Sequence, residues 1–154
     1  MRRKLVFVAV VLGLLMGTSS VASAQAFTET FTVHDFTEVF VDVNPCTGDP
    51  GTVTLNYNGV FHGTVDPNGG FHFTGTLAGT FELVPLDSSL PTYTGHFAQW
   101  FGGNTTSNSD GFWATFNIKG NGSDGSTLSV NAVTQIHFSN GVLHVQFETL
   151  NCHS

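Results

Sequence analysis

The sequence predicts an all-β fold, most simply a single antiparallel up-and-down β-barrel of eight or nine strands, with a coiled β-sandwich as the alternative. Phe and Gly are abundant, with 15 and 18 residues, and strong helix formers are scarce. Apolar and polar residues alternate along most of the chain, and sequences typical of tight turns separate the alternating segments. Closure into a barrel would also hide the sheet edges, where a Phe-rich chain is prone to aggregate.

Residues 1–24 have the three parts of a secretory signal peptide. Arg2–Lys4 is positively charged, Leu5–Met16 is apolar, and Ala22–Ala24 matches a small-residue cleavage site. The alternative is a membrane anchor, which usually requires about 20 apolar residues. We therefore expect a secreted mature chain of residues 25–154 that forms one domain, with no membrane span after cleavage.

The expected mature chain is strongly acidic. The whole sequence has a net charge of −7, but three of its four cationic residues lie in Arg2–Lys4. Cleavage leaves Lys119 against eleven Asp and Glu residues, a net charge of −10 with His neutral. One cation cannot neutralise a phosphate backbone, so the composition argues against nucleic acid as a partner. Anionic membrane surfaces are disfavoured for the same reason.

The two cysteines predict one disulfide, between Cys46 and Cys152. Secreted chains fold where disulfides persist, and these cysteines are not in a C-x-x-C arrangement. The bond would close a loop of about 100 residues, worth about 4.7 kcal/mol in the chain-entropy model. The alternative is a pair of free thiols in redox or metal chemistry.

The first expected strands lie on either side of the Cys46 turn. Phe27–Val43 alternates with a change of phase near Asp35, which indicates two strands or one strand with a bulge. Beyond Cys46, the segments 53–57 and 60–65 are expected to form a hairpin. Its loop would be Tyr57–Gly59, a register that puts Leu55 opposite Phe61.

The next expected strand carries the candidate ligand site. It follows an unambiguous turn at Asp66–Gly70, and its large apolar residues share one parity with two glycines. A glycine on an inner face either lets the sheet bend or leaves space for a ligand. The candidate ligand-binding residues are therefore Phe71, Phe73, Gly75, Gly79 and Phe81.

The remaining expected strands are 93–101, 112–119 and 128–138, followed by a C-terminal hairpin. Asn140–Gly141 is the strongest hairpin sequence in the chain and predicts a type I′ turn. That turn pairs Phe138 with Leu143 and Ile136 with Val145 on the apolar side. It also places His137 directly opposite His144.

Two imidazoles opposite each other on neighbouring strands can hold a transition metal, so His137 and His144 are the candidate metal ligands. The sequence offers no obvious third ligand, and the alternative is two solvated histidines. His62 and His72 are expected to be diagonal neighbours on one face. The match of Gly120–Gly125 to G-x-G-x-x-G joins two expected strands and opens no helix, so it predicts a hairpin loop. We expect no cofactor and name no catalytic residue.

Trp100 and Trp113 lie on different expected strands. Such aromatic side chains can line a carbohydrate or lipid site, and the alternative is ordinary core packing.

Four short motifs give the chain a resemblance to known proteins. They are Asn44–Asp49, the Val53–Leu55 strand, the turn Asp66–His72 and the final Asn151-Cys152. Together they resemble a group of small secreted proteins from actinobacteria for which no activity is known. The resemblance implies a bacterial extracellular origin and supplies no functional residue.

Three functions remain open at this point. The first is a non-enzymatic, lipocalin-like binder of a small apolar or amphipathic molecule. The second is a small barrel enzyme of the cyclase or isomerase type, which predicts a polar cluster inside the barrel. The third is a structural or adhesive surface protein without a pocket. The oligomeric state and the identity of any ligand are not predicted.

Overall fold

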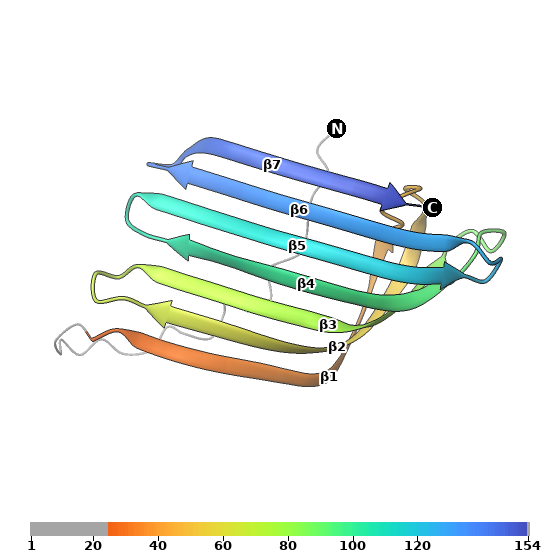
Figure 1. Ribbon diagram of the computed structural model, residues 1–154, viewed down its shortest axis with the longest axis horizontal. Helices are drawn as coiled ribbons and strands as arrows, with labels where there is room; N and C mark the ends of the chain where they lie inside the picture. The colour runs from red at the N-terminus through yellow and green to blue at the C-terminus, as the bar shows by residue number, and fades with distance from the viewer. Residues whose placement is uncertain (1–24, 154) are drawn as a thin grey trace.

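The computed structural model describes residues 25–153, so the expected signal peptide at 1–24 lies outside the described residues. Seven strands form one antiparallel sheet in chain order, each joined to the next by a hairpin connection (Figure 1). The all-β, up-and-down prediction is confirmed; counting the two halves of β1 separately gives eight strands. The strands are β1 (Phe27–Val43), β2 (Pro50–Val65), β3 (Phe71–Pro85), β4 (Tyr93–Thr105), β5 (Ser109–Gly122), β6 (Thr127–Ser139) and β7 (Val142–His153).

The sheet curls because one disulfide ties its two edges together. Cys46, in the loop after β1, is bonded to Cys152 in β7, and their Cα atoms are 5.7 Å apart. A flat sheet of this width would separate its edge strands by about 29 Å. In Figure 1, β1 and β2 bend at one end of the sheet toward the end of β7. The predicted disulfide is confirmed, and it indicates a non-reducing environment.

The curled sheet does not close. Among residues 25–153, backbone ladders join only strands that are neighbours in sequence, so a seam separates β1 from β7. The fold therefore lies between the expected barrel and the expected coiled sandwich. We call the concave side of the sheet, which holds the core, the inner face, and the other side the outer face.

The core lies on the inner face, near the disulfide. Only five apolar side chains in the described residues are buried, and partly buried side chains of β2, β4 and β5 pack around them. This core is small because the sheet is open, and inner-face side chains far from the disulfide, such as Phe31 and Phe71, stay exposed. The buried residues are Phe81, Leu83, Phe97, Leu128 and Val130.

The two ends of the curled sheet differ. Loops 44–49, 86–92 and 123–126 lie at the disulfide end, which we call the capped end. They bond to neighbouring segments there: the Leu86 amide donates to the Pro50 carbonyl at 2.9 Å, and the Ser123 amide to the Thr92 carbonyl at 2.9 Å. The other end, which we call the open end, has only short turns.

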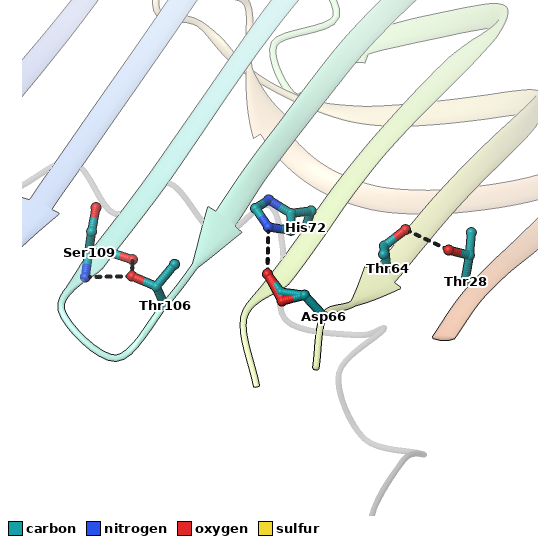
Figure 2. A network of polar contacts seen from close by, with 6 residues as sticks. All are labelled: Thr28, Thr64, Asp66, His72, Thr106 and Ser109. Atoms are coloured by element: carbon teal, nitrogen blue, oxygen red, sulfur yellow. Dashed lines mark hydrogen bonds and ion pairs between the residues drawn. The ribbon is translucent and has the colours of Figure 1, made fainter. Parts of the chain in front are cut away.

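Side-chain contacts fix the strand ends and turns at the open end (Figure 2). The hydroxyl groups of Thr28 and Thr64 are 3.0 Å apart across β1 and β2. Asp66 Oδ2 is 3.2 Å from His72 Nε2 across the β2–β3 turn. In the β4–β5 turn, the Ser109 amide donates to Thr106 Oγ1 at 3.0 Å. The strand ends and turns of the open end are therefore held by contacts of their own.

The expected hairpin loop at Tyr57–Gly59 is wrong. β2 continues through these residues, and Gly59 pairs with Leu77 of β3. Asn58 has another role, because its side-chain oxygen accepts the backbone N–H of Asp35 at 3.1 Å. Asp35 lies at the bulge of β1 and has a φ of 50°. Of the two alternatives for the phase change near Asp35, the structure therefore shows one strand with a bulge. Pairing with β3 over the full strand outweighs the local turn preference of Asn-Gly.

The Asn140–Gly141 turn is confirmed. Both residues have positive φ, 50° and 74°, as a type I′ turn requires, and Ser139 pairs with Val142. The pairing of Phe138 with Leu143 is also as predicted.

Beyond that pair, the predicted register of β7 is wrong by one residue. A bulge at His144 places Ile136 opposite Gln146 instead of Val145. The same shift places Cys152 opposite Val130, on the inner face, from which it reaches Cys46. Without the bulge, the register set by the Asn140–Gly141 turn would place Cys152 on the outer face, away from Cys46.

Candidate functional site

A network of phenylalanine rings covers the inner face toward the open end. The ring centroids of Phe31 and Phe61 are 6.0 Å apart, and those of Phe61 and Phe101 are 5.8 Å apart. These distances are typical of tilted aromatic pairs. Contacts at 5.7–6.5 Å extend the network across five strands to Phe71, Phe73 and Phe112. We call Phe31, Phe61, Phe71, Phe73, Phe101 and Phe112 the Phe ladder.

Glycines on the inner face allow rings from non-adjacent strands to meet. Gly75 of β3 pairs with both Phe61 and Phe101, and those two rings come together above it. A Cβ at Gly75 would lie 2.8 Å from Phe101 Cε2. Gly79 stands in the same way between Tyr57 and Phe97, whose centroids are 6.1 Å apart. The space above both glycines is therefore filled by the chain's own rings.

The predicted ligand-binding residues divide into three groups. Phe71, which is 36% exposed, and the half-buried Phe73 belong to the Phe ladder. Gly75 lies beneath the Phe101 ring, and a Cβ at Gly79 would meet Asn56 and Tyr57. Phe81 is only 7% exposed and belongs to the core, so a ligand resting on the open surface would not touch it.

Sequence reasoning missed four members of the Phe ladder. Phe101 was missed because the inward parity of its strand was unclear, and Phe61 because the expected hairpin hid its neighbours on β3. Phe31 and Phe112 had the correct parity in the sequence, and only the strand order brings them into one network. The usable signal was the recurrence of Phe and Gly at alternate positions of β3 and β4.

Carboxylates share the inner face with the rings. By register, Glu29 and Glu38 of β1 face inward, opposite Gly63 and Leu55 of β2. The Tyr57 hydroxyl donates to Glu38 Oε2 at 3.5 Å, which places the Glu38 side chain over the inner face. Burial raises the pKa of Tyr57 above its usual value, and the charge and hydrogen bond of Glu38 raise it further.

The candidate metal ligands lie near one another without the predicted direct pairing. His137 pairs with Val145, while His144 occupies the bulge, and the two ring centroids are 6.3 Å apart. In residues 25–153 no three His, Cys, Asp or Glu side chains gather closely enough to hold a metal. The His137–His144 metal site stays a prediction, as does the expectation that the chain carries no cofactor.

The other histidine pair lies as predicted. His62 is opposite Thr74 and His72 opposite Thr64, so the two histidines are diagonal neighbours on the outer face. Each has a polar partner, because His62 Nδ1 is 2.8 Å from Thr30 Oγ1 and His72 contacts Asp66.

Trp100 and Trp113 are outer-face residues and not part of the core. They are 44% and 41% exposed. The Trp113 ring lies over Gly102, where a Cβ would be 2.8 Å from Trp113 Cζ2. Gly120–Gly125 spans the end of β5 and the turn before β6, as the hairpin prediction requires.

No protein-family model, curated protein or solved structure matches this chain. Within residues 25–153, no helix has the length and apolar character needed to cross a membrane. The function is therefore argued from the site.

Proposed function

We propose that this chain is a secreted bacterial protein that binds a small apolar or amphipathic molecule on its inner face, without catalysis, in the manner of lipocalin-like barrels. The signal-peptide pattern of residues 1–24 supports secretion, and a disulfide agrees with an oxidising compartment. The ligand would rest on the Phe ladder and enter at the open end or through the seam between β1 and β7.

One observation carries the proposal: aromatic side chains on the inner face remain exposed in the folded chain. Phe31 and Phe36 of β1 are 55% and 49% exposed, although both lie on the face that holds the core. Contiguous exposed apolar surface in a soluble protein commonly marks a site of interaction. Apolar floors with few polar groups are also the usual composition of small-molecule sites.

The experiment uses N-phenyl-1-naphthylamine, a neutral apolar dye whose fluorescence rises on binding. We expect saturable binding to the purified mature chain and weaker binding to Phe31→Thr. Val41→Thr is the matched control, because Val41 lies on the same strand but on the outer face and is 69% exposed. Equal binding by both variants, or no saturable binding at all, would rule the proposal out.

The enzyme alternative receives less support. It requires polar groups close enough to act together, whereas the backbone ladders pair no inner-face carboxylate of β1, β5 or β7 with another carboxylate. Phe31→Thr should weaken binding of the ligand, and we expect neither the wild type nor this variant to convert the bound molecule chemically.

The adhesive alternative has one observation in its favour, the exposed pair Trp100 and Trp113 on the outer face. Trp100 lies opposite Thr76 and Thr115, and Trp113 lies opposite Gln135. Exposed indole rings among polar side chains can stack on sugar rings. Retention of the mature chain on insoluble polysaccharide, lost in Trp113→Ala and kept in Phe31→Thr, would support adhesion through this face.

A further inference from the structure

We infer that the molecule bound on the inner face is a cationic amphiphile, with its alkyl chain on the Phe ladder and its ammonium group beside the carboxylates of β1. This inference rests on the proposed function and specifies the class of ligand. It follows from how the charged residues divide between the two faces of the sheet.

Carboxylates of the strands gather on the inner face. Of the six that have a partner in the backbone ladders, only Glu82 faces outward, opposite Thr54 and Thr94. In an antiparallel sheet with one apolar face, charged side chains normally occupy the other face. The reverse arrangement here calls for a reason beyond solubility. The inward-facing carboxylates are Glu29, Glu38, Asp42, Asp110 and Glu148.

Among residues 25–153, no Lys or Arg on the inner face neutralises these carboxylates. Lys119, the only Lys or Arg in residues 25–153, faces outward between His96 and Ser129. All five histidines with a ladder partner also face outward; His34 and His144 lie at the bulges of β1 and β7. The five are His62, His72, His96, His137 and His153.

The carboxylates lie where a head group would lie. Glu29 is two residues from Phe31 on β1, and Glu38 is two residues from Phe36. Both phenylalanines are about half exposed. An alkyl chain that crosses the Phe ladder at Phe31 would reach the seam beside Glu29, and one that lies against Phe36 would reach it beside Glu38. An ammonium group there would meet opposite charge, and the ring faces would add a cation–π attraction. A carboxylate or sulfate head group would be repelled.

The test compares three amphiphiles with the same dodecyl chain by isothermal titration calorimetry, each below its critical micelle concentration. They are dodecyltrimethylammonium, neutral dodecyl maltoside and anionic dodecanoate. We expect the ammonium compound to bind at least about tenfold more tightly than the maltoside, and dodecanoate to bind most weakly. Added salt should reduce the difference, because exposed charges are screened.

Variants locate the effect. Glu29→Gln and Glu38→Gln should each reduce the preference for the ammonium compound and leave maltoside binding unchanged. Glu82→Gln is the matched control, because it removes the same charge from the outer face and should leave the preference intact. An equal loss of the ammonium preference in all three variants would overturn the inference, since the preference would then depend only on the net charge of the protein.

The outcomes separate this inference from the proposed function. If the maltoside binds and the three head groups give equal affinities, or dodecanoate binds best, the cationic preference is wrong and apolar binding stands. If none of the three compounds binds, the proposed function itself is wrong.

Discussion

At the scale of single residues, glycine determines how the inner face is packed. Of the three inner-face positions of β3 between Phe73 and Phe81, only Leu77 has a side chain, and Gly75 and Gly79 lie on either side of it. Because each stands between two aromatic residues, rings from β2 and β4 can touch across β3. Two adjacent aromatic positions would otherwise compete for the same volume. The missing side chains of Gly75 and Gly79 therefore leave the space that the neighbouring rings occupy.

Gly79→Ala should destabilise the fold by about 1–3 kcal/mol, because overpacking forces the backbone to move. The new Cβ would press against the Asn56 carbonyl oxygen and lie 2.7 Å from Tyr57 Cα. Urea unfolding measures the change. Gly63→Ala is the control, since its Cβ would meet only the Phe71 ring at 3.3 Å and should shift stability within about 0.5 kcal/mol. Equal effects would contradict this account of the glycines.

The pKa of Tyr57 should lie above its usual value, mainly because the side chain is partly buried and also because Glu38 is near. The stability that this residue adds is therefore fully present below about pH 10 and is lost as the pH rises through the higher pKa of the folded state. Phenolate absorbance follows the titration. In Glu38→Gln the pKa of Tyr57 should fall toward 10.0 but stay above it, since burial remains. Glu82→Gln should leave it unchanged, and an unshifted curve in Glu38→Gln would refute the contact.

At the scale of elements, two bulges decide which side chains face inward. The bulge of β1 changes the phase, so that Phe31 before it and Phe36 after it share the inner face. The bulge of β7 does the same for Cys152. A single added residue reverses the facing of every later residue in a strand. In each edge strand, one bulge therefore decides which of the later residues face inward.

Asp35→Val should cost about 1–2 kcal/mol, because a β-branched residue is poorly tolerated at positive φ. Asp35→Asn is the matched variant and should stay within about 0.5 kcal/mol, since Asn adopts this conformation readily. Thermal unfolding of both variants gives the comparison. A stable Asp35→Val protein would mean that β1 does not need this bulge.

The sequence was most informative where strands are regular. The faces of β3, β5 and β6 follow from alternation, and the turn at Asn140–Gly141 from its dipeptide. The same dipeptide at Asn58–Gly59 is no turn, because long-range pairing with β3 outweighs local preference. No local sequence pattern indicates the bulge at His144, which places Cys152 on the inner face. For the candidate site, alternation identified Phe71 and Phe73 but could not reveal which rings meet across strands.

At the scale of the whole molecule, one covalent bond holds together two edges that no backbone ladder joins in the described residues. Cys46 and Cys152 are 106 residues apart in sequence, and nearly the whole sheet lies between them. Cross-links that close long loops restrict the unfolded chain most strongly. In the folded state the same bond brings β7 to the loop after β1, beside the buried Asn44.

The double variant Cys46→Ala/Cys152→Ala should therefore lose about 2–5 kcal/mol of stability. Urea unfolding with and without a reductant measures the loss. Reduced wild-type protein should match the variant, and the variant itself should not respond to the reductant. Unfolding midpoints that coincide for oxidised wild type and variant would show that packing alone holds the edges.

The short connections at 66–70, 106–108 and 140–141 have a further consequence. They all lie at the rim opposite the disulfide, and none contributes a side chain to the buried core. Polar loop tips of this kind accept insertions more readily than any other part of a fold. The end that carries the disulfide is therefore fixed, whereas the three connections at the other end can change in length and sequence while the sheet stays intact.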